Sequence, residues 1–178
     1  MSLAYIALSA NLLSSAGPPE ATLTAAAERL ASLGGVTARS SLYSTEPVGF
    51  PDQPRFVNAA VALETHLSPR DLLGSLLAIE HEFGRDRAAS PPNGPRTLDL
   101  DVLFYGDLVL NHSGLEIPHP RLAVRAFVLV PLNEIAPDLR DPRSGKTVAE
   151  MLQALPDGAA PNAVAKIDYG LWTDTNVR

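Results

Sequence analysis

Six patterned segments follow one another along the first 106 residues in the order strand, helix, strand, strand, helix, strand. This order constrains the fold more than any other feature of the sequence. Strands are expected at 3–9, 36–47, 55–67 and 97–106, and helices at 18–33 and 69–83. The order predicts an α+β domain, a ferredoxin-like βαββαβ sandwich in which an antiparallel sheet has helices packed on its faces. The two helices should cover one face and leave part of the other available for a site.

The sequence after residue 106 is patterned more weakly. Residues 108–110 are a candidate hairpin partner for the strand at 97–106. The segment 117–137 has a helical pattern from about Arg121, and a short helix is expected at 146–156.

We expect a single domain over residues 1–156, followed by a C-terminal tail at 157–178. A chain of 178 residues is long enough to bury roughly 70% of the surface that it exposes when unfolded. Two alternatives stay open for the tail: it packs on the domain through Tyr169, Leu171 and Trp172, or it is mobile. No segment reads as an additional interface helix, so a monomer is expected.

The composition excludes several classes of protein. The chain has no cysteine, which excludes disulfides and thiolate metal sites and fits a reducing compartment. Its net charge of −6 disfavours binding to nucleic acid. The apolar stretches are too short for a membrane span, and the N-terminus lacks the basic segment of a signal peptide. We therefore expect a cytoplasmic protein that binds small molecules, with no membrane or nucleic acid as a partner.

Two carboxylates interrupt the apolar strand at 97–106. Alternation predicts one face that carries Leu98, Leu100, Val102 and Phe104, and an opposite face that carries Thr97, Asp99, Asp101, Leu103 and Tyr105. Residues two apart on a strand are separated by about 6.6 Å. Asp99 and Asp101 at that spacing suit one shared cation or two bridged metals, and their oxygen ligands favour Mg²⁺. The alternative is a solvated outer face of the strand.

Arginines gather in the sequence around these aspartates. Arg96 stands at the same strand end, and Arg85 and Arg87 lie in the irregular loop at 85–95. One guanidinium group can bind two phosphate oxygens at once through two of its N–H donors. Together with the two aspartates, this arrangement suits a site for a metal and a nucleotide. Surface ion pairs, each of small energy, are the alternative.

A second group of candidates lies around 119–125. His119 stands between two prolines, and Arg121 and Arg125 would share one face of the expected helix. A surface histidine or one satisfied inside the protein is the alternative for His119.

Asn58 and Phe56 point to a different kind of ligand. Asn58 lies in the middle of an apolar strand, and a buried amide needs hydrogen-bond partners. A flat heteroaromatic ligand would supply such partners and would stack on Phe56. The alternatives are an asparagine satisfied by backbone groups and a phenylalanine that packs in the core.

The segment GPRTLDLDVLFYG resembles the signature of the 6-hydroxymethyl-7,8-dihydropterin pyrophosphokinase family. Further segments resemble the same family in the same order and cover about residues 4–140: AYIALSANL, LYSTEPVG, DQPRFVNAAVALET, IEHEFGRDR and IPHPRLAVRAFVLVPLNEIAP. The resemblance implies transfer of the pyrophosphoryl group of ATP to the hydroxymethyl oxygen of 6-hydroxymethyl-7,8-dihydropterin. The products are AMP and the pterin diphosphate, and the pathway is folate biosynthesis.

The resemblance also implies roles for individual residues. Asp99 and Asp101 match the ligands of two Mg²⁺ ions that accompany ATP. The catalytic positions that match are Arg85, Arg96, Asp99 and Asp101. The ATP-binding positions that match are Glu80, Arg85, Arg87, Arg96, His119 and Arg125. The pterin-binding positions that match are Thr45, Val48, Phe56, Asn58, Asp99 and Phe127, with Phe56 and Phe127 as the rings on either side of the pterin.

The sequence departs from the family pattern in the loop at 85–95. Pro92 and Asn93 stand where the family commonly has Arg-Trp before GPR. Phe56 replaces a frequent tyrosine, and Leu77 stands where a polar residue can contact adenine. Two rival functions use the same residues: a Mg²⁺-dependent phosphoesterase with water as the nucleophile, and a non-catalytic domain that binds a small ligand for regulation.

Overall fold

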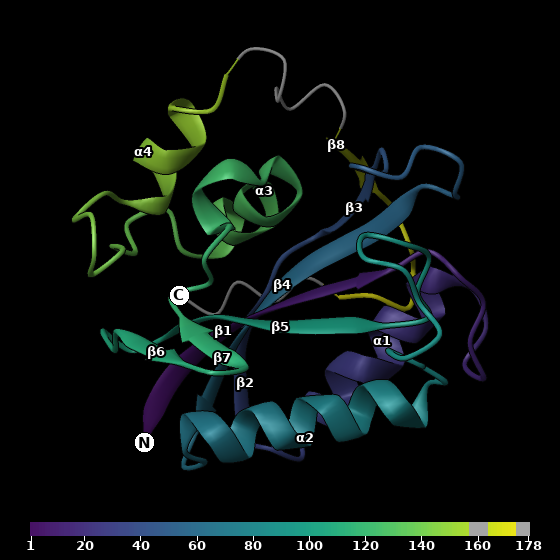
Figure 1. The fold of residues 1–178 in the computed structure, drawn as a ribbon, viewed down its shortest axis with the longest axis horizontal. Coiled ribbons are helices and arrows are strands. Elements are labelled where there is room, and N and C mark those ends of the chain that lie inside the picture. The colour runs from purple at the N-terminus through teal and green to yellow at the C-terminus, as the bar shows by residue number, and fades with distance from the viewer. Residues whose placement is uncertain (157–163, 174–178) are drawn as a thin grey trace.

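The computed structural model describes residues 1–156 and 164–173, and its centre is an antiparallel sheet with helices on both faces (Figure 1). The strands of this sheet are β1 (Ser2–Ala10), β2 (Gly35–Arg39), β3 (Leu42–Thr45), β4 (Phe56–Thr65), β5 (Asp99–Tyr105) and β8 (Val164–Ile167). The helices are α1 (Pro19–Leu30), α2 (Pro69–Glu82), α3 (Ala126–Ile135) and α4 (Val148–Gln153). A separate hairpin consists of β6 (Leu110–His112) and β7 (Leu115–Ile117).

The strand order of the main sheet is β5-β1-β4-β3-β8, with β2 also paired to β4. Every pairing is antiparallel. The fold prediction of a ferredoxin-like βαββαβ sandwich is confirmed, with β8 added at one edge. The single strand expected at 36–47 is two strands, because Ser40 interrupts the ladder and its Oγ accepts a hydrogen bond from the backbone N–H of Ala60 at 2.9 Å.

The two faces of the sheet carry different helices. Helices α1 and α2 cover one face, where Leu23 and Leu76 are fully buried against strand residues such as Leu8. Helices α3 and α4 lie on the opposite face, where Leu129 and Met151 pack (Figure 1). The prediction that α1 and α2 share one face is confirmed. Helix α3 covers only part of the other face, and the candidate site lies beside it.

A β-bulge in β5 corrects the predicted alternation. Tyr5 pairs with Phe104 and Ile6 with Val102, which leaves Leu103 as the extra residue. Phe104 therefore turns to the α3 side, and its predicted place beside Leu98, Leu100 and Val102 was wrong. Asp99 and Asp101 precede the bulge, so the prediction for their side of the strand is unaffected.

Two predictions for the segment after β5 were wrong. Residues 108–110 do not extend the hairpin with β5; instead β6 pairs with β7. The third helix begins at Ala126, because Leu122–Val124 forms a 3₁₀ turn and Arg125 has extended backbone angles of φ −116° and ψ 100°. Arg121 and Arg125 therefore do not share one face of an α-helix.

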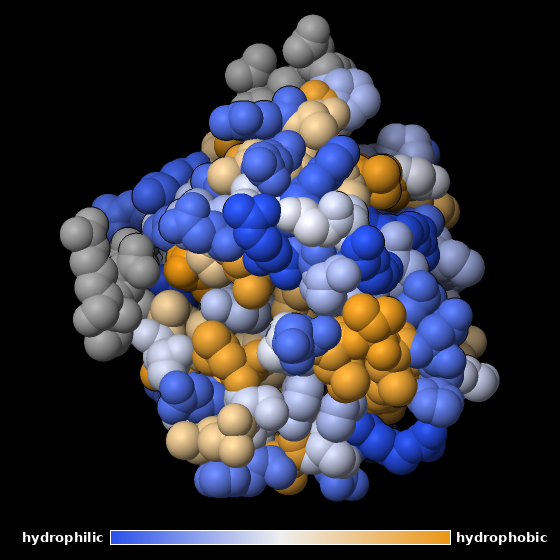
Figure 2. Space-filling model, turned by 90° about the vertical axis from the view of Figure 1, so that its left-hand side faces the viewer, coloured by the Kyte–Doolittle hydropathy of each residue, from blue (hydrophilic) through white to orange (hydrophobic). Residues whose placement is uncertain are grey.

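The tail contributes a strand to the sheet. Strand β8 pairs with β3, and Trp172 is buried, whereas Leu171 is 73% exposed. Residues 157–163 and 174–178 of the predicted tail lie outside the described residues. None of the described helices is both long and apolar enough to cross a membrane. On the side of the molecule with α4 and the β6–β7 hairpin, hydrophilic residues surround a compact hydrophobic patch right of centre and several smaller hydrophobic areas (Figure 2).

Candidate active site

A cavity of about 580 Å³ lies over the α3-side face of the sheet, next to the N-terminal end of α3. It brings together most of the residues that the sequence singled out. Those that line it are Thr45, Val48, Phe56, Asn58, Arg96, Asp99, Asp101, Arg125 and Phe127. Its size is typical of a site for a small ligand.

Three neighbouring strands form the floor of the cavity. Ser9 on β1 is paired with Asp99 on β5 and with Asn58 on β4. Residues directly opposite one another point to the same face of a sheet. A carboxylate and an amide therefore lie in one row, roughly 10 Å apart across two strand spacings. The small Ser9 between them leaves room for a ligand, and the sequence reasoning missed this residue.

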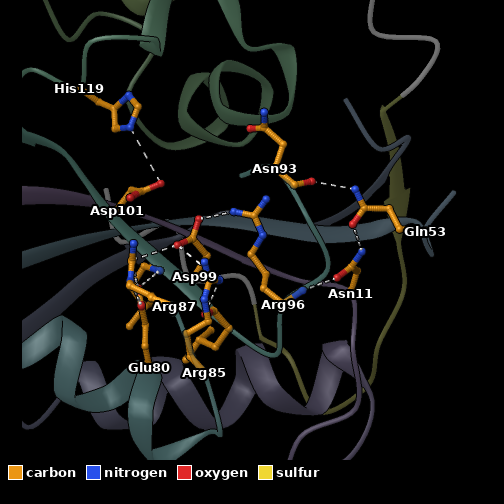
Figure 3. A network of polar contacts seen from close by, with 12 residues as sticks. Asn11, Gln53, Glu80, Arg85, Arg87, Asn93, Arg96, Asp99, Asp101 and His119 are labelled. Carbon is orange, nitrogen blue, oxygen red and sulfur yellow. Dashed lines mark hydrogen bonds and ion pairs between the residues drawn. The ribbon is translucent and has the colours of Figure 1, made fainter. Parts of the chain in front are cut away.

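Asp99 is the centre of an arginine cluster (Figure 3). Its carboxylate oxygens lie 2.8 Å from Arg96 Nη1, 3.3 Å from Arg87 Nη2 and 3.8 Å from Arg85 Nη1. Its side chain is only 11% exposed. Three guanidinium groups thus neutralise one buried carboxylate and collect positive charge beside the cavity.

Asp101 lies on the same face but in different surroundings. Its side chain is 34% exposed, and its Oδ2 lies 4.0 Å from His119 Nε2. Burial, reinforced by the negative charge of Asp99, raises the pKa of Asp101 to about 7. The two aspartates therefore have different surroundings although they are two residues apart.

His119 is a neutral imidazole in this site. Burial, with the positive charges of Arg125 and Arg121, lowers the pKa of His119 to about 4. Its Nδ1 accepts a hydrogen bond from the backbone N–H of Arg121 at 3.1 Å. The ring proton therefore resides on Nε2, which faces Asp101.

Glu80 connects α2 to the arginine cluster. It is 1% exposed and accepts hydrogen bonds from Arg87 Nε at 2.9 Å, from Arg87 Nη2 at 2.8 Å and from the backbone N–H of Leu100 at 3.0 Å. A second hollow of about 520 Å³ is lined by Leu77, Glu80, His81, Gly84, Arg85, Asp86 and Arg87. Arg87 bonds to both Glu80 and Asp99, so it connects this hollow with the main cavity.

The amide and the two rings lie at the other end of the cavity. Asn58 is 3% exposed, and its Nδ2 donates to Thr45 Oγ1 at 2.6 Å. The guanidinium of Arg96 lies 5.0 Å from the centre of the Phe56 ring, and that of Arg125 lies 5.4 Å from the centre of the Phe127 ring. Val48 is 65% exposed at the rim.

Three loops around the cavity are tied together by amide side chains that the sequence reasoning missed (Figure 3). Asn11 Nδ2 donates to Gln53 Oε1 at 3.0 Å, and Gln53 Nε2 donates to the carbonyl of Asn93 at 2.8 Å. The backbone N–H of Arg96 donates to Asn11 Oδ1 at 2.8 Å. Asn93 has a φ of +57°, a conformation that asparagine tolerates better than most residues. The Asn-Gly pair at 93–94 is the sequence signal for this turn.

Comparisons with known proteins agree with this architecture. The family model described as 7,8-dihydro-6-hydroxymethylpterin-pyrophosphokinase matches residues 5–137. A protein of Synechocystis named 2-amino-4-hydroxy-6-hydroxymethyldihydropteridine pyrophosphokinase is 47% identical over 152 residues, which cover 84% of this chain and 74% of that protein. A Pseudomonas aeruginosa protein of the same name is 47% identical over 152 residues, which cover 85% of this chain and 91% of that protein.

Fold, cavity and comparisons define an ATP-dependent diphosphotransferase. The chain belongs to the 7,8-dihydro-6-hydroxymethylpterin-pyrophosphokinase family.

Solved structures agree at the level of the fold. The structure of Plasmodium falciparum HPPK-DHPS with pteroate matches with a TM-score of 0.63 at 14% identity, over 84% of this chain and 41% of that chain. A structure of HPPK-DHPS in complex with substrates matches with a TM-score of 0.65 at 13% identity, over 84% of this chain and 42% of that chain. The chain thus spans about two fifths of those longer proteins.

Proposed function

We propose that the cavity beside α3 is where this chain transfers the pyrophosphoryl group of ATP to the hydroxymethyl oxygen of 6-hydroxymethyl-7,8-dihydropterin, giving AMP and the pterin diphosphate. The observation that carries the proposal is the convergence of Arg85, Arg87 and Arg96 on Asp99, which lines the main cavity together with Asp101 and Arg96. Anionic phosphates need such a cationic cluster in a protein of net charge −6.

The pterin fits the end of the cavity formed by β3, β4 and the start of α3. Phe56 and Phe127 both line the cavity and offer apolar faces for a flat ring. Asn58 and Thr45 offer an amide and a hydroxyl for the edge of the pterin, and Val48 closes the rim. A heteroaromatic ring with N–H and C=O groups would satisfy both kinds of contact.

The phosphates of ATP fit the end formed by β5 and the loop at 85–95. Arg85, Arg96 and Arg125 are the proposed phosphate ligands, since paired N–H donors match phosphate oxygens. Arg87 contributes from the loop, and Glu80 and His119 lie close to the expected nucleotide. Phosphoryl transfer needs positioning and charge neutralisation more than covalent help.

Asp99 and Asp101 are the proposed ligands of two Mg²⁺ ions. Both carboxylates face the cavity on one strand, and hard oxygen donors suit this ion. Bound Mg²⁺ would supply positive charge to the phosphate oxygens and favour loss of the hydroxymethyl proton. Because Asp101 must be ionised to serve as a ligand, its raised pKa makes Mg²⁺ binding dependent on pH. We propose that the enzyme works as a monomer in the cytoplasm.

The test is to incubate the protein with MgATP and the pterin and to measure AMP. We expect AMP that depends on both substrates, and we expect Asp101→Ala to lower turnover by at least about 10²-fold while circular dichroism shows an intact fold. Asp107→Ala, at an exposed aspartate just after β5, is the matched control and should keep normal turnover.

Other outcomes would separate the rival functions. Hydrolysis of ATP without the pterin would favour the phosphoesterase. Binding of pterin or ATP without formation of AMP would favour the regulatory domain. Near-normal turnover of a folded Asp101→Ala protein would refute the proposed metal ligands.

A further inference from the structure

We propose that the C-terminal segment 164–172 is a positioning element that builds the pterin end of the cavity from outside the sheet. This inference rests on the proposed location of the pterin between Phe56 and Phe127. The segment starts with strand β8 and ends at a buried tryptophan, and its two ends lie on opposite faces of the sheet. It therefore wraps around the edge strand β3, which carries Thr45.

The first contact of the segment is with the cavity itself. Val164 lines the cavity and is paired with Thr45 in the β3–β8 ladder. Thr45 in turn accepts the hydrogen bond from Asn58. The four-residue strand β3 would be the edge of the sheet without β8, and an unpaired edge strand is less well fixed. The β3–β8 ladder thus connects the tail to Asn58, whose amide we expect to bind the pterin.

The second contact anchors the end of the segment on the opposite face. Trp172 is 8% exposed and packs with the core beneath α1 and α2. Its Nε1 donates to the backbone carbonyl of Ser40 at 2.8 Å. The guanidinium of Arg39 lies 5.7 Å from the centre of its ring. Since Ser40 lies two residues before β3, this anchor fixes the start of the strand whose end reaches the cavity.

The third contact joins the segment to α3. Glu134 on α3 accepts hydrogen bonds from the backbone N–H of Ser41 at 3.1 Å, from Ser41 Oγ at 2.7 Å and from the hydroxyl of Tyr43. Lys166 on β8 lies 3.9 Å from the same carboxylate. An exposed lysine contributes little energy, but the cluster holds β3, β8 and α3 together. Helix α3 carries Phe127, so both walls of the pterin end depend on this junction.

The position of the segment predicts a selective effect on the two substrates. Strand β8 lies at one edge of the sheet, and β5, with Asp99 and Asp101, lies at the opposite edge. Loosening the tail should therefore weaken binding of the pterin and leave binding of MgATP nearly unchanged. A general loss of stability would affect both substrates alike.

The experiment compares Trp172→Ala, Trp172→Phe and the matched control Leu171→Ala, whose side chain is 73% exposed in the native protein. We expect Trp172→Ala to raise the KM for the pterin about tenfold, which corresponds to about 1.4 kcal/mol, and to change the KM for MgATP by less than about twofold. Trp172→Phe keeps the ring without the N–H and should recover most of the loss. Leu171→Ala should match the native protein.

A parallel rise of both KM values, or unchanged KM values in a folded Trp172→Ala protein, would overturn the positioning role. If Trp172→Ala does not fold, Val164→Asp tests the same wall at a partly exposed position and should raise only the KM for the pterin. Equal effects on both substrates in that variant would also overturn the inference. Absence of pterin-dependent AMP in the native protein would instead refute the proposed function, so the two failures are distinguishable.

Discussion

Asp99 and Asp101 show how position on a strand decides the chemistry of identical side chains. Asp99 is surrounded by guanidinium groups from the loop at 85–95 and the start of β5. Asp101 faces a neutral imidazole, and burial, reinforced by the negative charge of Asp99, raises its pKa to about 7. Asp101 is thus the aspartate that changes its charge near neutral pH.

The raised pKa of Asp101 predicts a pH-dependent difference in stability for Asp101→Asn. Between the ordinary value of 3.8 and about 7 the folded protein keeps the proton that the unfolded chain has lost. The free energy of unfolding from this group is therefore highest at low pH and falls as the pH rises toward 7. Asp101→Asn lacks this term, so it should gain stability relative to the native protein between pH 4 and 7.

Urea unfolding at a series of pH values, with EDTA present, measures this difference. His119 has a lowered pKa and gives the opposite trend, but it is present in both proteins and cancels to first order. Parallel pH profiles for the two proteins would contradict the assignment.

At the level of elements, the amide contacts of Asn11 and Gln53 connect three loops around the cavity. Gln53 is the central member, because it bonds to Asn11 on one side and to the carbonyl of Asn93 on the other. The loop at 85–95 has Pro92 and Asn93 where the resemblance to the family leads us to expect Arg-Trp, and here the Asn93 carbonyl accepts the hydrogen bond from Gln53. The contact fixes the loop that carries Arg85 and Arg87.

Gln53→Ala should loosen the loop at 85–95 without affecting the core. Each lost hydrogen bond contributes about 0.5–1.5 kcal/mol, so amide hydrogen exchange in this loop should become roughly tenfold faster. The KM for MgATP should rise with it. Asp52→Ala, at the exposed neighbouring position, is the control. Equal rates of amide hydrogen exchange in Gln53→Ala and Asp52→Ala would show that the hydrogen bonds of Gln53 do not hold the loop.

The helices and strands were easier to predict from the sequence than the bulges and turns within and between them. The order of strands and helices follows from periodic apolar residues, so the ferredoxin-like topology was predictable. The bulge at Leu103 was not, because an inserted residue leaves the local alternation unchanged while it reverses the face of Phe104. The backbone conformation of Arg125 was not predictable either, because the turn before α3 sets its extended angles.

The candidate site was predictable as a list of residue types near Asp99, and the structure brings most of them to one cavity. The contributions of Ser9, Asn11 and Gln53 to the site were not predictable, because these residues reach it only through tertiary contacts. Strand β8 was also missed, because four residues carry too little pattern to identify a strand.

For the whole molecule, the sheet separates two hydrophobic cores, and the proposed substrate positions place the ATP end above one and the pterin end above the other. The core beneath α1 and α2 supports the helix that carries Glu80 and leads to the arginine loop. The core beneath α3 supports the helix that carries Phe127. The two cores should therefore influence activity in different ways even where they contribute equally to stability.

Leu76→Ala and Leu129→Ala test this division, since both leucines are fully buried on opposite faces. Each should lower the free energy of unfolding by about 2–5 kcal/mol, measured by urea unfolding. At a temperature where both variants stay folded, Leu129→Ala should mainly raise the KM for the pterin and Leu76→Ala that for MgATP. The same substrate effect in both variants would contradict the division.

Trp172 is the single tryptophan of the chain, and it lies where the tail meets the body of the protein. The protein therefore contains its own optical reporter: the intrinsic fluorescence of the indole should shift to longer wavelength whenever the ring leaves the core for water. Detachment of the tail can then be followed in real time during titration with either substrate, without a label.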